Sequence, residues 1–103
     1  AEGLVENAEL LGEMFRNEIN EYAKTSSIAK LVRGKGLLNA IVINDSEESE
    51  TALNICKLMA SKGLLAKPTH GNIIRFAPPL IITSDQLMAA LSIIKDALRE
   101  FEK

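Results

Sequence analysis

The chain has 103 residues, of which 47% are hydrophobic and 25% are charged. This size and composition predict one folded domain with one hydrophobic core, and they exclude a disordered polar chain. Twelve basic and fourteen acidic residues give a formal net charge of -2, so the overall charge does not favour binding to nucleic acid or to an anionic membrane. The longest apolar stretch, Leu37 to Ile43, contains Asn39 and is too short to span a bilayer.

The sequence contains one cysteine, Cys56, and one histidine, His70. A single thiol cannot form an internal disulfide, and this fits a reducing compartment. Because no second thiol lies nearby in the sequence, there is no zinc-binding spacing either. We expect His70, which lies in a turn-forming segment, to shape that loop or to contact a neighbouring domain. No Ser/His/Asp set, carboxylate pair or metal cluster is recognisable. The chain by itself therefore looks catalytically incomplete.

Apolar residues recur every three or four positions in the N-terminal segment, with polar residues on the other faces. This spacing predicts an amphipathic helix that ends near Lys24. Its expected buried positions are Leu4, Ala8, Leu11, Phe15, Ile19 and Tyr22.

Two strands are predicted next, at residues 27–33 and 37–43, and the second is expected to be largely buried. Between them lies Arg33-Gly34-Lys35-Gly36. Glycines of this kind let backbone N–H groups approach a phosphate, and Lys35 would add charge. However, the segment precedes a strand and not the N-terminus of a helix, so a tight turn is the favoured interpretation.

Helical spacing returns after residue 50 and continues to Gly63, which is suited to a left-handed helix end followed by a hydrophobic contact of Leu64. The expected buried positions are Ala52, Ile55, Cys56 and Met59. We expect Cys56 to be a small core residue. The acidic residues around the start of this helix are expected to be solvated, and they are Asp45, Glu47, Glu48 and Glu50.

Residues 64–66 and 72–76 are predicted to be two short strands on either side of a turn at 67–71. Thr83 and Gln86 have the spacing of a capping box and therefore predict the start of the last helix. The buried stripe of that helix is expected at Leu87, Leu91, Ile94, Leu98 and Phe101. The element order α-β-β-α-β-β-α predicts a two-layer α+β domain, with helices packed on one face of a mainly antiparallel sheet.

Arg75 is the charged residue with the most unusual surroundings, because it lies in an apolar strand that is followed by Pro78-Pro79. A guanidinium held in place by a short strand can bind a carboxylate through two parallel hydrogen bonds. From the residues alone, a structural ion pair or an exposed strand arginine is the more common role for such a residue.

Residues 32–40 and 63–80 together resemble class-III aminotransferases. The Arg-Gly-x-Gly-Leu turn beginning at Arg33 and the Arg-x-x-Pro-Pro element beginning at Arg75 are both similar to motifs of that class. The segment Lys67 to Gly71, Lys-Pro-Thr-His-Gly, is similar to the members of the class that act on ornithine. The resemblance extends over nearly the whole chain.

This resemblance implies that residues 1–103 are the C-terminal small domain of an enzyme whose large, cofactor-binding domain lies outside this chain. The enzyme is expected to transfer the δ-amino group of ornithine to 2-oxoglutarate with pyridoxal phosphate. The catalytic lysine and the cofactor-binding residues belong to the large domain, so neither Lys35 nor Lys67 takes the catalytic role. Arg75 matches the arginine that binds the α-carboxylate of the substrate. The resemblance further implies a dimer-based enzyme of the cytoplasm or the mitochondrial matrix.

Three alternatives remain open at this point. The chain could belong to another class-III ω-aminotransferase with a different amino donor. It could be a free-standing regulatory module in which Arg75 and the glycine turn bind a small anion. It could also be a structural or dimer-forming piece, whose apolar stripes face the missing domain.

Overall fold

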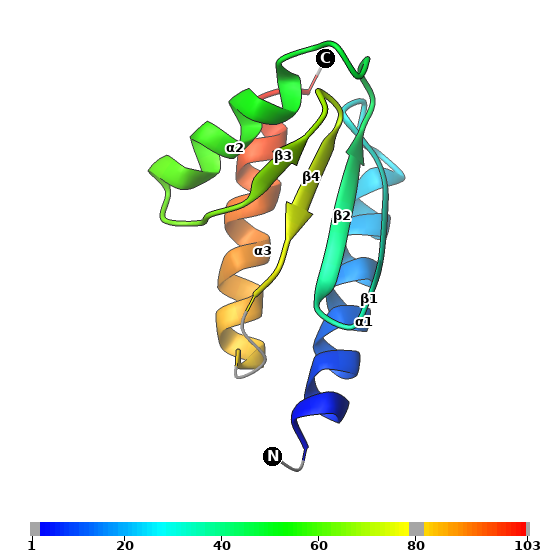
Figure 1. The fold of residues 1–103 in the computed structure, drawn as a ribbon, viewed down its shortest axis with the longest axis vertical. Helices are drawn as coiled ribbons and strands as arrows, with labels where there is room; N and C mark the ends of the chain where they lie inside the picture. The colour runs from blue at the N-terminus through cyan, green and yellow to red at the C-terminus, as the bar shows by residue number, and fades with distance from the viewer. Residues whose placement is uncertain (1–2, 79–81, 103) are drawn as a thin grey trace.

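The computed structural model describes residues 3–78 and 82–102, so Pro79 of the Arg-x-x-Pro-Pro element lies outside the described residues. Three helices and four strands follow one another in the predicted order α-β-β-α-β-β-α (Figure 1). Their bounds are α1 Leu4–Ala23, β1 Ala29–Lys35, β2 Leu38–Ile43, α2 Thr51–Ser61, β3 Lys67–Thr69, β4 Ile73–Phe76 and α3 Ser84–Arg99.

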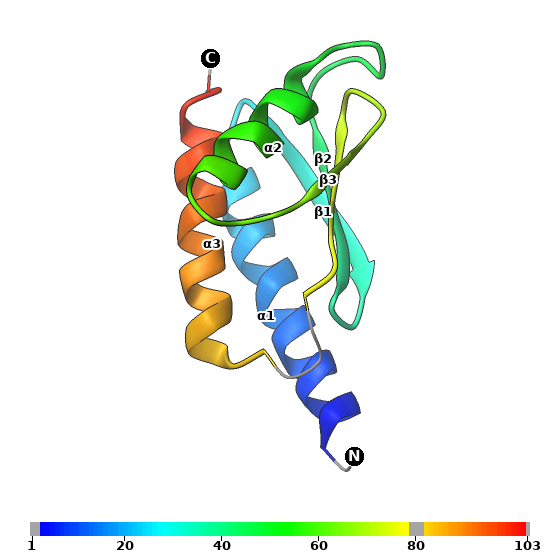
Figure 2. The same ribbon diagram turned by 60° about the vertical axis from the view of Figure 1, so that its left-hand side comes forward.

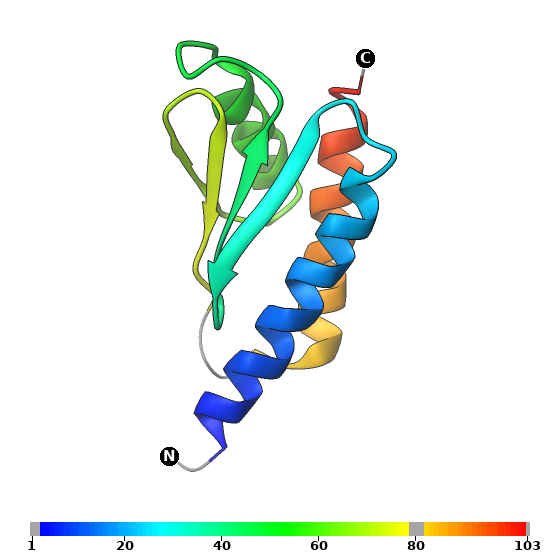
Figure 3. The ribbon, with the colours of Figure 1, turned by 90° about the vertical axis from the view of Figure 1, so that its right-hand side faces the viewer.

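The strands form one sheet in the order β1-β2-β4-β3, and every neighbouring pair is antiparallel. In Figure 2 the helices lie on one side of this sheet, and Figure 3 shows α1 and α3 alongside each other, to the right of the sheet in that view. The predicted two-layer α+β architecture is therefore confirmed. One face of the sheet is covered by helices, and we call the opposite face the open face.

Each helix buries most of the apolar stripe that its sequence predicts, but Leu4, Tyr22 and Phe101 are only half-buried, and Phe101 follows the end of α3. The stripe residues buried in the core are Ala8, Leu11, Phe15, Ile19, Ala52, Ile55, Cys56, Met59, Leu87, Leu91, Ile94 and Leu98. The capping box of α3 is formed, because Gln86 N donates to Thr83 Oγ1 at 3.1 Å and Thr83 N donates to Gln86 Oε1 at 2.9 Å. Gly63 has a φ of 94°, which confirms the left-handed end of α2.

Two details of the predicted strands are wrong. Strand β2 is not largely buried: its residues alternate between the core and the open face, and Leu38 is 67% exposed. The third strand is Lys67–Thr69 and not 64–66. Pro68 argued against a strand at that point, but β3 is an edge strand, where a missing N–H costs little.

The turn between β1 and β2 rests directly on helix α1. Arg16 Nη1 donates to Gly36 O at 2.9 Å and to Asn39 Oδ1 at 2.8 Å. Asn39 is buried, and its Nδ2 donates to the same Gly36 carbonyl at 3.3 Å. Gly12 of α1 lies so close to the turn that a Cβ atom there would be 1.8 Å from Gly36 O. A side chain at position 12 would therefore push the turn away from the helix.

We predict that Gly12→Ala destabilises the fold by about 1–3 kcal/mol, because the added methyl group overpacks this contact. Helix propensity alone predicts the opposite sign, since alanine favours a helix over glycine by about 1 kcal/mol. Urea unfolding of the two chains measures the difference. Glu13→Ala, at the adjacent exposed position, is the control and should change stability by less than about 0.5 kcal/mol. Equal stability of Gly12→Ala and the parent chain would contradict the close contact.

Candidate functional site

Arg75 lies on the open face of the sheet, in the interior strand β4. Its chain neighbours Ile74 and Phe76 are only 1% and 6% exposed, because their side chains point into the core on the helical side. Successive side chains of a strand point to opposite faces. Because Ile74 and Phe76 are buried in the core, Arg75 lies on the open face. The side chain of Arg75 is exposed. Of the described residues, none forms a hydrogen bond or ion pair with its guanidinium.

Strand pairing places Arg75 in a row that crosses the sheet. Arg75 is opposite Ala40 of β2 on one side and opposite Lys67 of β3 on the other. Ala40 is in turn opposite Arg33 of β1. Residues directly opposite each other in antiparallel strands share a face, so the row Arg33, Ala40, Arg75, Lys67 presents three cations on the open face. We call these four residues the cationic row.

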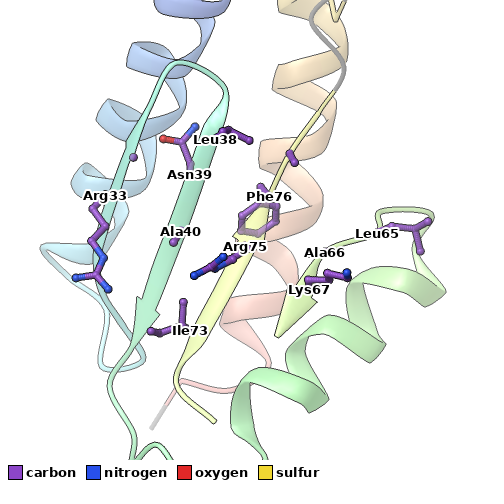
Figure 4. A pocket seen from close by; sticks show the side chains of 12 residues that line it. Arg33, Leu38, Asn39, Ala40, Leu65, Ala66, Lys67, Ile73, Arg75 and Phe76 are labelled. Atoms are coloured by element: carbon purple, nitrogen blue, oxygen red, sulfur yellow. The ribbon is translucent and has the colours of Figure 1, made fainter. Parts of the chain in front are cut away.

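An open cavity of about 730 Å³ lies over the cationic row. Figure 4 shows the side chains that line it, with Arg75 directed toward the neighbouring strand β2, which carries Ala40. Ala40 has a small side chain, which leaves room beside Arg75. Apolar side chains complete the lining, among them Leu65, which is 85% exposed in this chain. None of the described residues that line the cavity is acidic, so the site is suited to an anion.

The turn favoured from the sequence is present, but it lies at Gly36 and Leu37, because Gly34 and Lys35 belong to strand β1. A Cβ on Gly34 would lie 2.2 Å from Leu38 O, and Gly36 has a φ of 57°. The Gly36 carbonyl accepts hydrogen bonds from Arg16 and Asn39. Gly34 is therefore required by the close approach of the hairpin's own backbone, whereas Gly36 is favoured by its left-handed conformation.

His70 is exposed and has a φ of 60°, so it shapes the turn between β3 and β4 as expected. The next residue, Gly71, fixes that turn to the loop before α2. Gly71 N donates to Glu47 O at 2.7 Å, and Ser49 Oγ donates to Gly71 O at 3.0 Å. The proposed contact of His70 with a neighbouring domain stays a prediction.

Cys56 is buried in the core, and burial raises the pKa of its thiol to about 11. This agrees with the expected role as a small core residue and not as a nucleophile. The four acidic residues before α2 are exposed, as expected; they are Asp45, Glu47, Glu48 and Glu50.

Glu102 forms a hydrogen-bonded cluster that the sequence did not reveal. Its carboxylate accepts hydrogen bonds from Tyr22 Oη at 2.5 Å, Ser26 Oγ at 2.6 Å and Ser27 N at 2.7 Å. Burial pushes the pKa of Glu102 upward, but hydrogen bonds from Ser26, Tyr22 and Ser27 outweigh it and lower that pKa to about 2. Burial, together with the bond to Glu102, raises the pKa of Tyr22 to about 12. The cluster joins the C-terminal end of the chain to the α1–β1 loop.

The open face does not supply a complete pyridoxal phosphate site. That cofactor needs a lysine, an acidic partner for the pyridine nitrogen and a phosphate cup, and the cavity lining contains no acid. The described residues also hold no group of three or more His, Cys, Asp and Glu that could bind a metal ion. Within the described parts of the chain, no helix is long and apolar enough to cross a membrane. The described lining of this cavity is thus cationic and apolar, a composition that suits an anion.

Residues 1–98 match the family model of class-III aminotransferases. The chain therefore belongs to the class-III aminotransferase family, which confirms the resemblance of its two motif segments. It is 55% identical to the ornithine aminotransferase of Emericella nidulans over 100 residues, and 44% identical to the mitochondrial ornithine aminotransferase of Rattus norvegicus over 100 residues. These matches cover 96% and 97% of this chain but 22% of each relative. The chain thus spans about a fifth of the length of these relatives.

Solved structures agree with the sequence relatives. The acetylornithine aminotransferase of Elizabethkingia anophelis is similar with a TM-score of 0.92 and 54% identity, over 97% of this chain and 25% of that chain. The ornithine aminotransferase of Plasmodium yoelii is similar with a TM-score of 0.88 and 40% identity, over 98% of this chain and 26% of that chain. The small α+β fold is therefore shared with enzymes that are about four times longer.

We predict that stability depends on the ionised form of Glu102 at low pH. The folded-state pKa of about 2 lies below the ordinary value of 4.5, so the contribution is complete above about pH 4.5 and is lost as the pH falls toward 2. Glu102→Gln should cost about 1–3 kcal/mol at pH 7 and clearly less at pH 3. Urea unfolding at both pH values measures this, with Glu100→Gln at the exposed neighbouring position as control. A pH-independent loss would contradict the role of the charge.

Proposed function

We propose that this chain is the substrate-binding small domain of a pyridoxal-phosphate-dependent aminotransferase that transfers the δ-amino group of ornithine to 2-oxoglutarate. The cofactor supplies the electronic chemistry of amino transfer when it is bound. The catalytic lysine and the cofactor-binding residues lie in the large domain, outside this chain. The names of the curated relatives support ornithine as the donor.

The observation that carries the proposal is the position of Arg75. Its strand is fixed on both sides by pairing with β2 and β3, and its guanidinium is exposed in a cavity lined without acids. A structural ion pair, the common alternative for such an arginine, is absent among residues 3–78 and 82–102. A planar guanidinium held in this way binds a carboxylate through two hydrogen bonds.

In this proposal Arg75 aligns the substrate. A carboxylate bound to a fixed guanidinium orients the rest of the molecule, so that its reacting carbon lies against the cofactor of the large domain. The rigid strand matters because small displacements of a bound substrate reduce the rate strongly. Leu65 and the other apolar side chains around the cavity would contact the large domain in the assembled, dimer-based enzyme. The mitochondrial names of several relatives support a matrix location, whereas the names of the two fungal relatives carry no such label and fit the cytoplasm.

We predict that Arg75→Lys in the full-length protein raises the KM for 2-oxoglutarate by roughly 10- to 100-fold, because lysine loses the two-pronged geometry of a charged hydrogen bond. Cofactor binding, followed by the absorbance of the bound pyridoxal phosphate, should not change. Arg99→Lys is the matched control, because Arg99 lies on α3 and pairs with Asp96, away from the open face. Unchanged steady-state constants in Arg75→Lys would remove the proposed role.

Ornithine and N-acetylornithine distinguish two donors within the class, since a solved structure similar to this chain is an acetylornithine enzyme. We predict that the full-length protein uses ornithine with a kcat/KM at least about tenfold higher, which corresponds to a difference of about 1.4 kcal/mol in the transition state. Glutamate formation from 2-oxoglutarate measures both reactions. The 103-residue chain with added pyridoxal phosphate serves as a negative control and should form none. A preference for N-acetylornithine would assign the chain to another class-III aminotransferase.

A further inference from the structure

Lys67 and Arg75 are direct partners in the β3–β4 ladder. Both side chains are exposed, and both line the open cavity. In Figure 4 they extend from neighbouring strands with their charged ends directed apart. No described residue forms an ion pair with either of them. Strands β3 and β4 therefore carry two positive charges at one register position, without an ion-pair partner among the described residues.

Such an arrangement is unfavourable for the sheet itself. Like charges directly opposite each other destabilise an antiparallel pair, whereas an acidic residue at position 67 would form a cross-strand ion pair with Arg75. The rest of the sheet adds to the repulsion, because the four strands contain five basic residues and no acidic residue. The thirteen acidic residues in the described parts of the chain all lie outside the strands. The sheet is thus cationic in a chain whose net charge is -2.

A bound anion would offset this repulsion. Ala40, on the other side of Arg75, supplies a small side chain and no charge, so the positive potential around Arg75 comes from Lys67 on one side and from Arg33 two strands away on the other. Strands lie about 4.8 Å apart, which places the backbone of Lys67 about half as far from Arg75 as that of Arg33. Lys67 is accordingly the stronger neighbour.

We infer that Lys67 is a second cation of the carboxylate site, which strengthens the binding of an anion at Arg75 by charge and selects dianionic over monoanionic 2-oxo acids. This inference rests on the proposed role of Arg75. The ligand class is a 2-oxo dicarboxylic acid. Coulomb energy rises with ligand charge and falls with distance, so the ammonium group of Lys67 favours a dianion more strongly than a monoanion that binds through the same carboxylate. Lys67 acts as a specificity-determining residue and not as a catalytic residue.

The test uses the full-length protein with Lys67→Gln, with 2-oxoglutarate as the dianionic probe and pyruvate as the monoanionic probe. We expect the KM for 2-oxoglutarate to rise roughly three- to tenfold, and the KM for pyruvate to rise by less than about threefold. The difference should shrink at high ionic strength, because salt screens the charge. The ligand-free protein should unfold at a temperature roughly 1–2 °C higher, because the like-charge pair is gone.

Lys35→Gln is the matched control. Lys35 is also an exposed lysine on the open face, but it lies on β1, opposite Leu38 of β2. Strand β1 is two strands away from β4, which carries Arg75. Its removal should leave the ratio of the two KM values unchanged. A second variant, Lys67→Glu, should raise the KM for 2-oxoglutarate more than tenfold, since the new carboxylate competes for Arg75.

Equal effects of Lys67→Gln on both acids, no effect on either, or a lower unfolding temperature would overturn the inference. Failure of the underlying proposal gives a different pattern. If Arg75→Lys leaves the KM for 2-oxoglutarate unchanged, the carboxylate site itself is wrong, and the role of Lys67 falls with it. If Arg75→Lys raises that KM and Lys67→Gln does not, only the second cation is wrong.

Discussion

The alternation of side chains along β4 is the constraint on which the site depends. Ile74 and Phe76 are buried under the helices, and Phe76 packs against Phe15 of α1 with ring centroids 5.3 Å apart. A shift of one residue in the register of β4 would move these two side chains to the open face and Arg75 into the core. Both outcomes are unfavourable, so the hydrophobic core fixes the side on which the guanidinium lies.

Two polar contacts then hold the rest of the sheet against its helices. Arg16 fixes the β1–β2 turn through the Gly36 carbonyl and buried Asn39, and β2 is the strand that carries Ala40 beside Arg75. Glu102 joins the end of the chain to the loop that leads into β1. Both contacts are made from the helical side, and the first of them also fixes Asn39, which lines the cavity. The open face is therefore supported without being occupied.

The helices could be predicted from the sequence, because an apolar stripe and the Thr83–Gln86 capping box are local signals. The third strand was misplaced because Pro68 suggested a turn, and this error placed Lys67 in a loop and hid its pairing with Arg75. Glu102 was missed for a different reason. Its hydrogen-bond partners lie 74 to 80 residues away in the chain, and nothing near Glu102 in sequence indicates them. Arg75 could be predicted from its apolar surroundings and its motif. That no described residue pairs with its guanidinium could be seen only in the structure.

The separation of charge between the two layers connects the fold to its proposed use. Acidic residues on the helices and loops keep the chain's net charge at -2, while the sheet keeps an acid-free face. A domain selected for stability alone would gain from cross-strand ion pairs on such a face. Proteins retain destabilising arrangements mainly where function requires them. The cations of β3 and β4, which have no ion-pair partner among the described residues, therefore support the proposal that this face binds an anion. The hydrophobic core lies on the other side of the sheet, under the three helices, so the repulsion between these cations does not disturb it.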